Sequence, residues 1–348
     1  MSESSSAVAR AGHMKKLVDL MPVKIAGMGH YLPGTVLKSD QIEERLHIPR
    51  GWISKHTGVE ERRIAEKGQL PSDLAAEASW KAMKSAGISP KDIDLILFGS
   101  TGRDMAIPAT ACILQDKISA KNAATFDINA VCLSFLVGLD MAHYYVATGK
   151  YETVLVVSAE IPSRVVNWED KFSCGLFGDG AGAAVITRAD PAKESSDIIY
   201  SYFGCDGSKR EAITVRGFGL QYLPHETQQR PELNLFKMDG LASFKYAMEI
   251  APAFFKKLFE GFGYSAQEID WVIPHQANLP GLKKFMRAAK VPFEKCYINI
   301  QKYGNTSSAS IPIALSEAVA EGKVQRGSKL VLAATAAGFS WGGCCLVY

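Results

Sequence analysis

The 348-residue sequence contains no CxxC pair among its seven cysteines, and no cysteine stands at metal-ligand spacing from any of the seven histidines. This absence argues against a structural zinc site and against a thioredoxin-like redox motif. Unpaired cysteines fit a compartment that keeps thiols reduced. We therefore predict a cytoplasmic protein that needs no metal and no redox cofactor.

An excess of charge of one sign is also missing. The chain has 39 Lys and Arg residues against 36 Asp and Glu residues, for a net charge of +3. Nucleic-acid-binding proteins usually carry a concentrated basic surface, so this balance argues against a nucleic-acid partner. Any anionic partner would have to be met by a local group of basic side chains.

Long apolar runs are scarce as well. Residues 1–21 are rich in Ser and Ala and then basic, without the apolar core or cleavage site of a signal peptide, so we interpret them as a flexible extension or a cloning remnant. Only the C-terminal KLVLAATAAGFSWGGCCLVY approaches the length of a membrane span. Its Gly-rich middle predicts two short strands joined by a turn, and we predict no membrane partner.

The sequence does contain apolar, strand-like runs that alternate with helical patterns such as SDLAAEASWKAMKSAG. The alternation predicts an α/β fold with a largely parallel sheet. With 47% hydrophobic residues, the chain is long enough for one large domain or two fused ones. The predicted strands are residues 23–29, 93–100, 123–129, 153–160 and 181–187.

The second half of the chain repeats the first. SAGISPKDIDLIL at 85–97 and GFGYSAQEIDWVI at 261–273 align at an offset of 176 residues, and the same offset brings LVLAATA onto VLVVSAE. We predict two copies of one βα unit, in an N-terminal half at 22–190 and a C-terminal half at 191–348. Residues 191–240 match neither copy and predict an irregular surface connection that forms one wall of a substrate channel.

Candidate polar residues stand at three points where strand-like runs end or helical patterns begin. Cys132 lies between the run at 123–129 and a helical pattern, His275 and Asn278 follow WVIP, and Asn305 lies in GNTSS, an N-capping sequence. In parallel α/β sheets, ligands gather where strands end and helices begin. By the internal repeat, the Asn305 segment is the counterpart of the Cys132 segment, so the two should face each other across a pseudo-twofold axis.

A Cys, a His and an Asn that converge are suited to acyl transfer, in which the thiolate attacks an acyl carbonyl and keeps the acyl group. A helix N-terminus would lower the pKa of the Cys132 thiol. His275 and Asn305, as neutral donors, would stabilise the enolate of a second substrate and so permit carbon–carbon bond formation. Each residue taken alone also has a structural interpretation, as a packed thiol, a loop histidine and a helix cap.

The other cysteines do not share this setting. Cys112 lies in a helical pattern, whereas Cys344 and Cys345 lie in a strand, and we interpret these three as packing residues. The sequence leaves Cys174, Cys205 and Cys296 undecided.

From about residue 22 to residue 348, the chain resembles the ketoacyl-ACP synthase III family, thiolase-fold enzymes that condense an acyl-CoA with malonyl-ACP. The resemblance implies two duplicated βα halves in α-β-α-β-α layers, a homodimer, and a decarboxylative Claisen condensation that gives a 3-oxoacyl-ACP. The motifs that carry it, in the family's order, are AGMGHYLPG, GWISKHTGVEERR, the Cys132 segment, FGDGAGAAV, IPHQAN, GNTSSASIP and GFSWG.

The resemblance also implies roles for individual residues. Cys132 would be the acylated nucleophile, His275 and Asn305 would support decarboxylation, and the backbone N–H groups of Cys132 and Ala337 would form the oxyanion hole. His56 stands where the family often has Arg, and Pro280 where an Arg commonly helps to bind the carrier or CoA. The implied CoA-binding residues are Trp52, Arg164, His56 and Asn278. The implied acyl-pocket residues are Ile107, Thr335 and Phe339, and Ile107 would be contributed to the pocket of the other subunit across the dimer interface.

A basic stretch, LKKFMRAAK, follows IPHQAN and places Lys283, Lys284 and Arg287 on roughly one helical face. One interpretation is a solvated helix face. The other is a docking site for acyl carrier protein or its phosphopantetheine, where an anion is met locally.

Several alternatives remain at the level of the sequence. GSTGRDMAIPATA and CLSFLVGLD also resemble the long-chain branch that makes olefin precursors without decarboxylation, but that branch carries a Glu base where this chain has Ile107. The chain could also pass its acyl group to another acceptor in specialised metabolism, hydrolyse it as a thioesterase, or serve as a non-catalytic subunit of a heterodimeric synthase.

Overall fold

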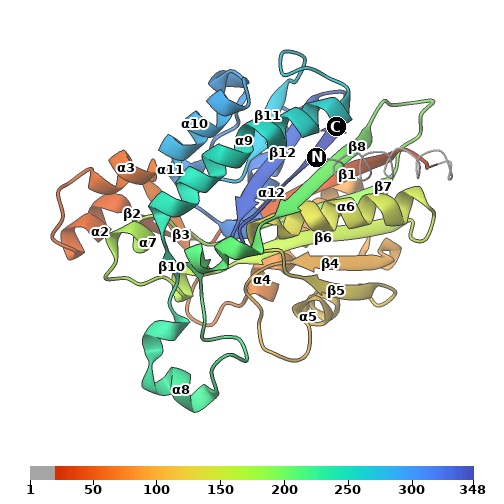
Figure 1. Cartoon of the computed structure of the whole chain (residues 1–348). Helices are drawn as coiled ribbons and strands as arrows, with labels where there is room; N and C mark the ends of the chain where they lie inside the picture. The colour runs from red at the N-terminus through yellow and green to blue at the C-terminus, as the bar shows by residue number, and fades with distance from the viewer. Residues whose placement is uncertain (1–19) are drawn as a thin grey trace.

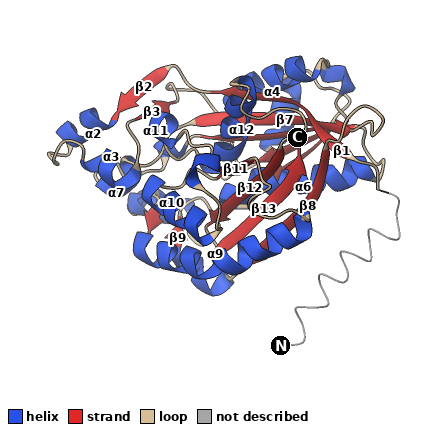
Figure 2. Cartoon of the chain, turned by 90° about the horizontal axis from the view of Figure 1, so that it is seen from above, coloured by secondary structure: helices blue, strands red, loops and turns tan. Residues whose placement is uncertain are grey.

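The structure, a computed structural model, describes residues 20–348 and is built around two β-sheets (Figures 1 and 2). The first sheet has the order β1-β7-β6-β4-β5, and the second has the order β8-β13-β12-β11 when read in the matching direction. In both sheets the first two pairings are antiparallel and the next is parallel. The predicted duplication is therefore visible in strand order and direction, while the division of the chain at residue 190 stays a prediction.

The five strands of the first sheet coincide with the predicted apolar runs. The first sheet consists of β1 (Val23–Tyr31), β7 (Gly180–Arg188), β6 (Thr153–Glu160), β4 (Leu95–Gly99) and β5 (Ala124–Ile128). The second consists of β8 (Asp197–Cys205), β13 (Ser340–Val347), β12 (Lys329–Ala336) and β11 (Trp271–Pro274).

The prediction of a largely parallel sheet is wrong, because both sheets are mixed. β12 and β13 are joined by only residues 337–339, and a connection this short can only return as an antiparallel hairpin. The predicted pair of C-terminal strands is confirmed, and this hairpin is that pair. Within residues 20–348, no helix has both the length and the apolar character needed to cross a membrane.

Helices cover the sheets in three layers (Figures 1 and 2). Two helices, α6 (Ser134–Ala147) and α12 (Ser310–Ala320), lie between the sheets and contact both of them. α4 (Pro71–Ala86) and α5 (Thr110–Lys117) cover the outer face of the first sheet. α9 (Gly240–Phe262) and α10 (Leu279–Ala288) cover the outer face of the second. The predicted α-β-α-β-α layering is confirmed.

Most side chains of the central helix layer are buried. α6 and α12 are apolar on nearly every side, which is typical of helices buried on all faces. Leu136 of α6 and Ile311 of α12 pack with Val156 of the first sheet and Leu332 of the second in one buried cluster. Side chains at the ends of this layer are therefore shielded from solvent by both halves of the chain.

A smaller unit packs beside the two sheets. It consists of the hairpin β2 (Thr35–Lys38) and β3 (Glu61–Ile64) with the short helices α2 (Ser39–Arg45), α3 (Trp52–Thr57), α7 (Lys171–Cys174) and α11 (Ile300–Tyr303). Fully buried Arg62 holds it together, since its guanidinium donates to the carbonyls of Leu37 and Gly175 and to the Ser39 hydroxyl. Burial lowers the pKa of Arg62 to about 10.

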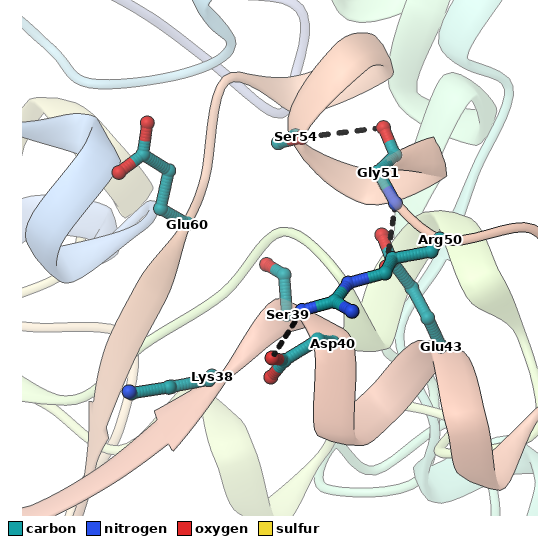
Figure 3. A pocket seen from close by; sticks show the side chains of 8 residues that line it. All are labelled: Lys38, Ser39, Asp40, Glu43, Arg50, Gly51, Ser54 and Glu60. Atoms are coloured by element: carbon teal, nitrogen blue, oxygen red, sulfur yellow. Dashed lines mark hydrogen bonds and ion pairs between the residues drawn. The ribbon is translucent and has the colours of Figure 1, made fainter.

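Buried Glu43 fixes the start of α3, because its carboxylate accepts the N–H groups of Gly51 at 2.7 Å and Ile53 at 2.8 Å. A polar surface depression lies at this point (Figure 3). None of Cys132, His275 or Asn305 borders it. The lining residues are Lys38, Ser39, Asp40, Glu43, Arg50, Gly51, Ser54 and Glu60.

The predicted irregular connection at 191–240 is wrong for its first part. β8 lies there and pairs with β13 along its length, in the place that β1 occupies in the first sheet. The rest, from residue 206, contains only short elements: the 3-10 helices η4 (Gly207–Ala212) and η5 (Pro231–Asn234), and the two-residue strands β9 (Ile213–Thr214) and β10 (Lys237–Met238). The short helix α8 (Pro224–Gln229) in this part projects from the body (Figure 1).

The predicted extension at 1–21 lies outside the described residues up to position 19. Its last two residues are attached to the fold: Leu20 packs against the central cluster, and the Met21 N–H donates to the Ala147 carbonyl.

Among the cysteines, Cys344 and Cys345 are buried in β13 as predicted. The packing interpretation of Cys112 is wrong, because its side chain is exposed on α5.

We predict that Gly182→Ala destabilises the fold by about 1–3 kcal/mol. Gly182 lies on β7 under α12, and an added Cβ would lie 2.7 Å from the Pro312 Cβ and 2.8 Å from the Ile313 nitrogen. Urea denaturation measures the loss. Gly34→Ala is the matched control, since no atom lies within 4 Å of the added methyl group. Equal midpoints for the two variants would contradict the predicted clash.

Candidate active site

Two equivalent turns meet at the end of the central layer. η2 (Val131–Leu133) leads into α6 and η7 (Ser307–Ala309) leads into α12, 176 residues further along the chain. Val131 and Ser307 occupy the same position in the two turns, and both have left-handed backbone angles, with φ of 54° and 49°. Such angles are strained for residues with a side chain and often mark functional sites.

The two turns contact each other through Cys132 and Ser307. The Cys132 Sγ lies 3.7 Å from the Ser307 Oγ, within hydrogen-bonding distance for sulfur. The Cys132 segment and the GNTSS segment therefore face each other, as the repeat predicted. The thiol lies immediately before α6, between the two halves of the chain.

Asn305 is held in one orientation by η7. Its Oδ1 accepts the Ser307 N–H at 2.8 Å, and its own N–H and carbonyl bond to the Leu176 carbonyl and the Gly178 N–H. Because an N–H donor must face the amide oxygen, the amide nitrogen with its two protons is the end left for a ligand. Asn305 is 6% exposed.

His275 directly follows β11 and is buried at 4% exposure. Its N–H donates to the Ala333 carbonyl of β12, which fixes the backbone beside the central layer. Burial lowers the pKa of His275 to about 4, so the imidazole is neutral near neutral pH. This agrees with the neutral donor expected from the sequence.

Ser310 controls which ring nitrogen of His275 carries the proton. Its Oγ lies 3.1 Å from the His275 Nδ1 and 2.8 Å from the Ser307 carbonyl. The hydroxyl has one proton to donate. Donated to Nδ1, it leaves the ring proton on Nε2, whereas donated to the carbonyl, it makes Nδ1 the donor and Nε2 an acceptor.

The prediction that the helix N-terminus lowers the pKa of Cys132 is wrong for this structure. Burial raises the pKa of the Cys132 thiol to about 12, and the nearby Glu160 carboxylate raises it further, while the hydrogen bond with Ser307 lowers it. The cost of removing a thiolate from water here exceeds the benefit of the helix end. Cys132 is therefore a protonated thiol at rest.

Glu160 is the acidic group of this site. It ends β6, is 2% exposed, and accepts bonds from both the N–H and the hydroxyl of Thr101 and from the Gly102 N–H. From the other half of the chain, the hydroxyls of Ser307 at 3.4 Å and Ser308 at 2.6 Å donate to Oε1. Burial raises the pKa of Glu160, and these hydrogen bonds act against that rise.

The residues implied for the oxyanion hole and the acyl pocket lie in different settings. Ala337 directly follows β12, a strand that contacts η2. Thr335 pairs with Trp341 across the hairpin, and Phe339 is buried with its ring 5.3 Å from that of Tyr246. Ile107 is 87% exposed, so it lies on the surface of this chain.

Three of the four implied CoA-binding residues gather at α3. The His56 ring stacks on Trp52 with centroids 4.2 Å apart, and Asn278 donates from Nδ2 to the His56 carbonyl at 2.9 Å. The Lys171 Nζ lies 4.6 Å from the Trp52 ring centroid, a neighbour that the sequence did not indicate. Arg164 is instead held by the chain before α4, where it donates to the Glu66 and Gln69 carbonyls.

The basic face of α10 lies next to this group. Asn278 caps α10 by accepting the Gly281 N–H, so one side chain joins α10 to α3. Lys283, Lys284 and Arg287 are all exposed on α10. The structure is consistent with both interpretations of these residues, a solvated face and a docking surface.

Sequence reasoning missed Glu160, Ser307 and Ser310. Glu160 did leave a signal, since it is the one charged residue at the end of the largely apolar run TVLVVSA. The two serines lie inside the GNTSSAS motif but are common turn residues.

Among residues 20–348, no group of three or more His, Cys, Asp and Glu side chains is gathered to hold a metal ion.

Comparison with known proteins agrees with this geometry. Two family models match, 3-oxoacyl-[acyl-carrier-protein (ACP)] synthase III over residues 126–207 and its C-terminal counterpart over 259–348. The β-ketoacyl-[acyl-carrier-protein] synthase III of Caldanaerobacter subterraneus subsp. tengcongensis is 40% identical over 91% of this chain and 95% of its own.

Solved structures of similar proteins share the fold of this chain. The 3-oxoacyl-[acyl-carrier-protein] synthase III of Aquifex aeolicus VF5 superposes with a TM-score of 0.86 at 38% identity, covering 94% of this chain and 100% of that one. The priming β-ketosynthase of the R1128 polyketide pathway superposes with a TM-score of 0.87 at 28% identity, covering 94% and 97%.

The duplicated layered fold, with a thiol before one central helix and an Asn before the other, defines a thiolase-fold condensing enzyme of the acyltransferase type. Within this class, the chain belongs to the β-ketoacyl-[acyl-carrier-protein] synthase III family. The fold class, family and enzyme class predicted from the sequence are confirmed.

The low pKa of His275 predicts a pH-dependent stability. Between the unfolded pKa of 6.5 and the folded pKa of about 4, the unfolded chain binds a proton that the folded chain does not, so stability falls as the pH falls through this window. Relative to His275→Gln, the wild type should lose about 3 kcal/mol between about pH 7 and pH 4. Urea denaturation at a series of pH values measures the difference, and identical pH dependence of the two proteins would contradict it.

Proposed function

We propose that this protein loads an acyl group from acyl-CoA onto Cys132 and condenses it with malonyl-ACP, with loss of carbon dioxide, to give a 3-oxoacyl-ACP. The observation that carries the proposal is the junction of η2 and η7, where a thiol, an amide and a neutral imidazole are linked through two serines. Family membership adds independent support.

In the first half-reaction, the Cys132 sulfur attacks the acyl carbonyl, and the CoA sulfur leaves. The backbone N–H groups of Cys132 and Ala337 hold the oxyanion in this proposal. The contact between η2 and β12, the strand that Ala337 follows, supports this assignment.

In the second half-reaction, the malonyl carboxylate leaves as carbon dioxide, and its electron pair forms an enolate that attacks the thioester carbon. The carbon–sulfur bond to Cys132 breaks, and the sulfur takes up a proton from solvent. The Asn305 amide and the His275 Nε2–H stabilise the enolate oxygen, with the Ser310 hydroxyl donating to Nδ1. Burial of both residues strengthens such hydrogen bonds.

The surface around α3 serves the carriers in this proposal. Trp52, His56, Asn278 and Arg164 bind CoA, and Lys171, a cation beside the Trp52 ring, is placed to meet its phosphates. The basic face of α10 binds acyl carrier protein. Two copies form a cytoplasmic homodimer, in which Ile107, exposed on its own chain, completes the acyl pocket of its neighbour together with Thr335 and Phe339.

A second candidate keeps the acylation of Cys132 and changes the acceptor. The likeness to a priming β-ketosynthase of a polyketide pathway favours it. Both candidates predict an acyl-enzyme, and they differ in what removes the acyl group.

The acyl-enzyme is the first test. Intact-mass measurement after incubation with a panel of acyl-CoAs should show one acyl adduct on the wild type and none on Cys132→Ala. Addition of malonyl-ACP should then release carbon dioxide and 3-oxoacyl-ACP. His275→Ala and Asn305→Ala should keep the adduct and lose condensation by roughly 100-fold or more. Free acid in place of the carbon–carbon product would indicate a thioesterase, and no adduct on the wild type would refute the proposal.

Carrier docking on α10 is tested by charge reversal. Lys284→Glu should raise the KM for malonyl-ACP about three- to tenfold, with less effect at high salt and little effect on the KM for acyl-CoA. Lys84→Glu on α4, an exposed lysine of the opposite outer layer, is the matched control. An equal KM for the two variants would leave α10 as a solvated face.

A further inference from the structure

A continuous set of hydrogen bonds leads from the reactive thiol to a buried carboxylate. The Cys132 Sγ lies 3.7 Å from the Ser307 Oγ, and the Ser307 Oγ donates to the Glu160 Oε1 at 3.4 Å. The Ser307 hydroxyl has one proton, which faces Glu160, so its lone pairs are available to the Cys132 S–H. The directions of the two bonds therefore suit a proton that moves from sulfur to carboxylate.

Glu160 is held as an acceptor. Five donors converge on its two oxygens, from Thr101, Gly102, Ser307 and Ser308, an arrangement that favours the ionised form. No ion pair among the described residues involves Glu160. Because the carboxylate is buried without a cation, it binds a proton more readily than a carboxylate in water does.

The thiol requires such an acceptor. Cys132 is protonated at rest, and its sulfur must lose the proton when it attacks a thioester. The Nδ1 of His275 is occupied by Ser310, and the hydrogen bond of the Cys132 sulfur is made with Ser307. The path through Ser307 is the one that the geometry provides.

The hydroxyl at position 307 is not required by the turn itself. Val131 occupies the equivalent position in η2, has the same left-handed backbone, and has no hydroxyl. In both turns an Asn two residues earlier accepts the N–H of this residue, so the backbone bond is common to both. The additional feature of η7 is the side-chain oxygen directed at both Cys132 and Glu160.

We propose that Ser307 and Glu160 form a proton relay for Cys132, in which Ser307 is the catalytic residue that contacts the sulfur and Glu160 is the proton acceptor that acts through it. The relay rests on the proposed function, since it serves the acylation of Cys132 by acyl-CoA.

The step balances without any further reactant. As the Cys132 sulfur forms its bond to the acyl carbon, its proton moves to the Ser307 Oγ, and the Ser307 proton moves to the Glu160 Oε1. The bond between the acyl carbon and the CoA sulfur then breaks, and the leaving CoA thiolate takes the proton back from Glu160 through Ser307. Acyl-enzyme and free CoA thiol are the products, and Glu160 is ionised again.

The test compares two neighbouring serines. Ser307→Ala removes the link to Cys132 and keeps a Cβ, so the backbone strain at this position is unchanged. Ser308→Ala removes a shorter hydrogen bond to the same carboxylate, at 2.6 Å, without touching the thiol. Single-turnover acylation, followed by quenching and intact-mass measurement, should slow by roughly 100-fold in Ser307→Ala and by less than about fivefold in Ser308→Ala.

The pH profile separates a relay from a structural role. In the wild type, acylation should change little with pH between about 6 and 9, because the relay accepts the proton during the attack and no preformed thiolate is needed. In Ser307→Ala it should rise about tenfold per pH unit over this range, because only preformed thiolate reacts. Glu160→Gln should show the same rise, and the double variant should be no slower than either single variant.

Three results would overturn the relay: a Ser307→Ala rate within about threefold of the wild type, a flat pH profile in that variant, or an equal loss in Ser308→Ala. These results differ from a failure of the proposed function. If the wild type forms no acyl adduct, the function fails, whereas an adduct that forms equally fast on wild type and Ser307→Ala refutes the relay alone. An unchanged urea-denaturation midpoint of Ser307→Ala confirms that the fold of this variant is intact.

Discussion

The contact between η2 and η7 is the constraint on which the rest of the site depends. Both turns place a residue in a strained left-handed conformation, and both are held there by an Asn two residues earlier. Each turn starts a helix of the central layer, and the two turns contact each other directly, while α6 also contacts η7. The strain is tolerated because the two sheets and the two central helices fix the chain on both sides.

Burial of this contact determines the protonation of every group near it. The same removal from water raises the pKa of Cys132, lowers that of His275 and raises that of Glu160. All three shifts favour the uncharged form. The site therefore rests with a neutral thiol and a neutral imidazole, while five hydrogen-bond donors oppose the neutralisation of the carboxylate. Charge on the thiol develops only during a reaction, when preorganised donors stabilise it most.

Much of the fold could be predicted because its signals are local. The apolar runs at 93–100 and 153–160 form β4 and β6. The 176-residue repeat corresponds to two sheets of matching strand order. The prediction of a largely parallel sheet was wrong, because an apolar run does not indicate whether its neighbouring strand is parallel or antiparallel to it. β8 was missed, because the resemblance between β8 and β1 lies in their place in the sheet and not in their residues.

The family and the layered fold could be inferred from motifs in the amino-acid sequence, and the same motifs predicted Cys132, His275 and Asn305 as site residues, because motifs and caps are properties of neighbouring residues. The protonation states of these residues depend instead on the tertiary structure. Glu160 lies 147 positions from Ser307 and 148 from Ser308, and the thiol 175 from the hydroxyl that it contacts. A pKa depends on desolvation and on charges a few ångströms away, and these are fixed only when the two halves of the chain have packed together.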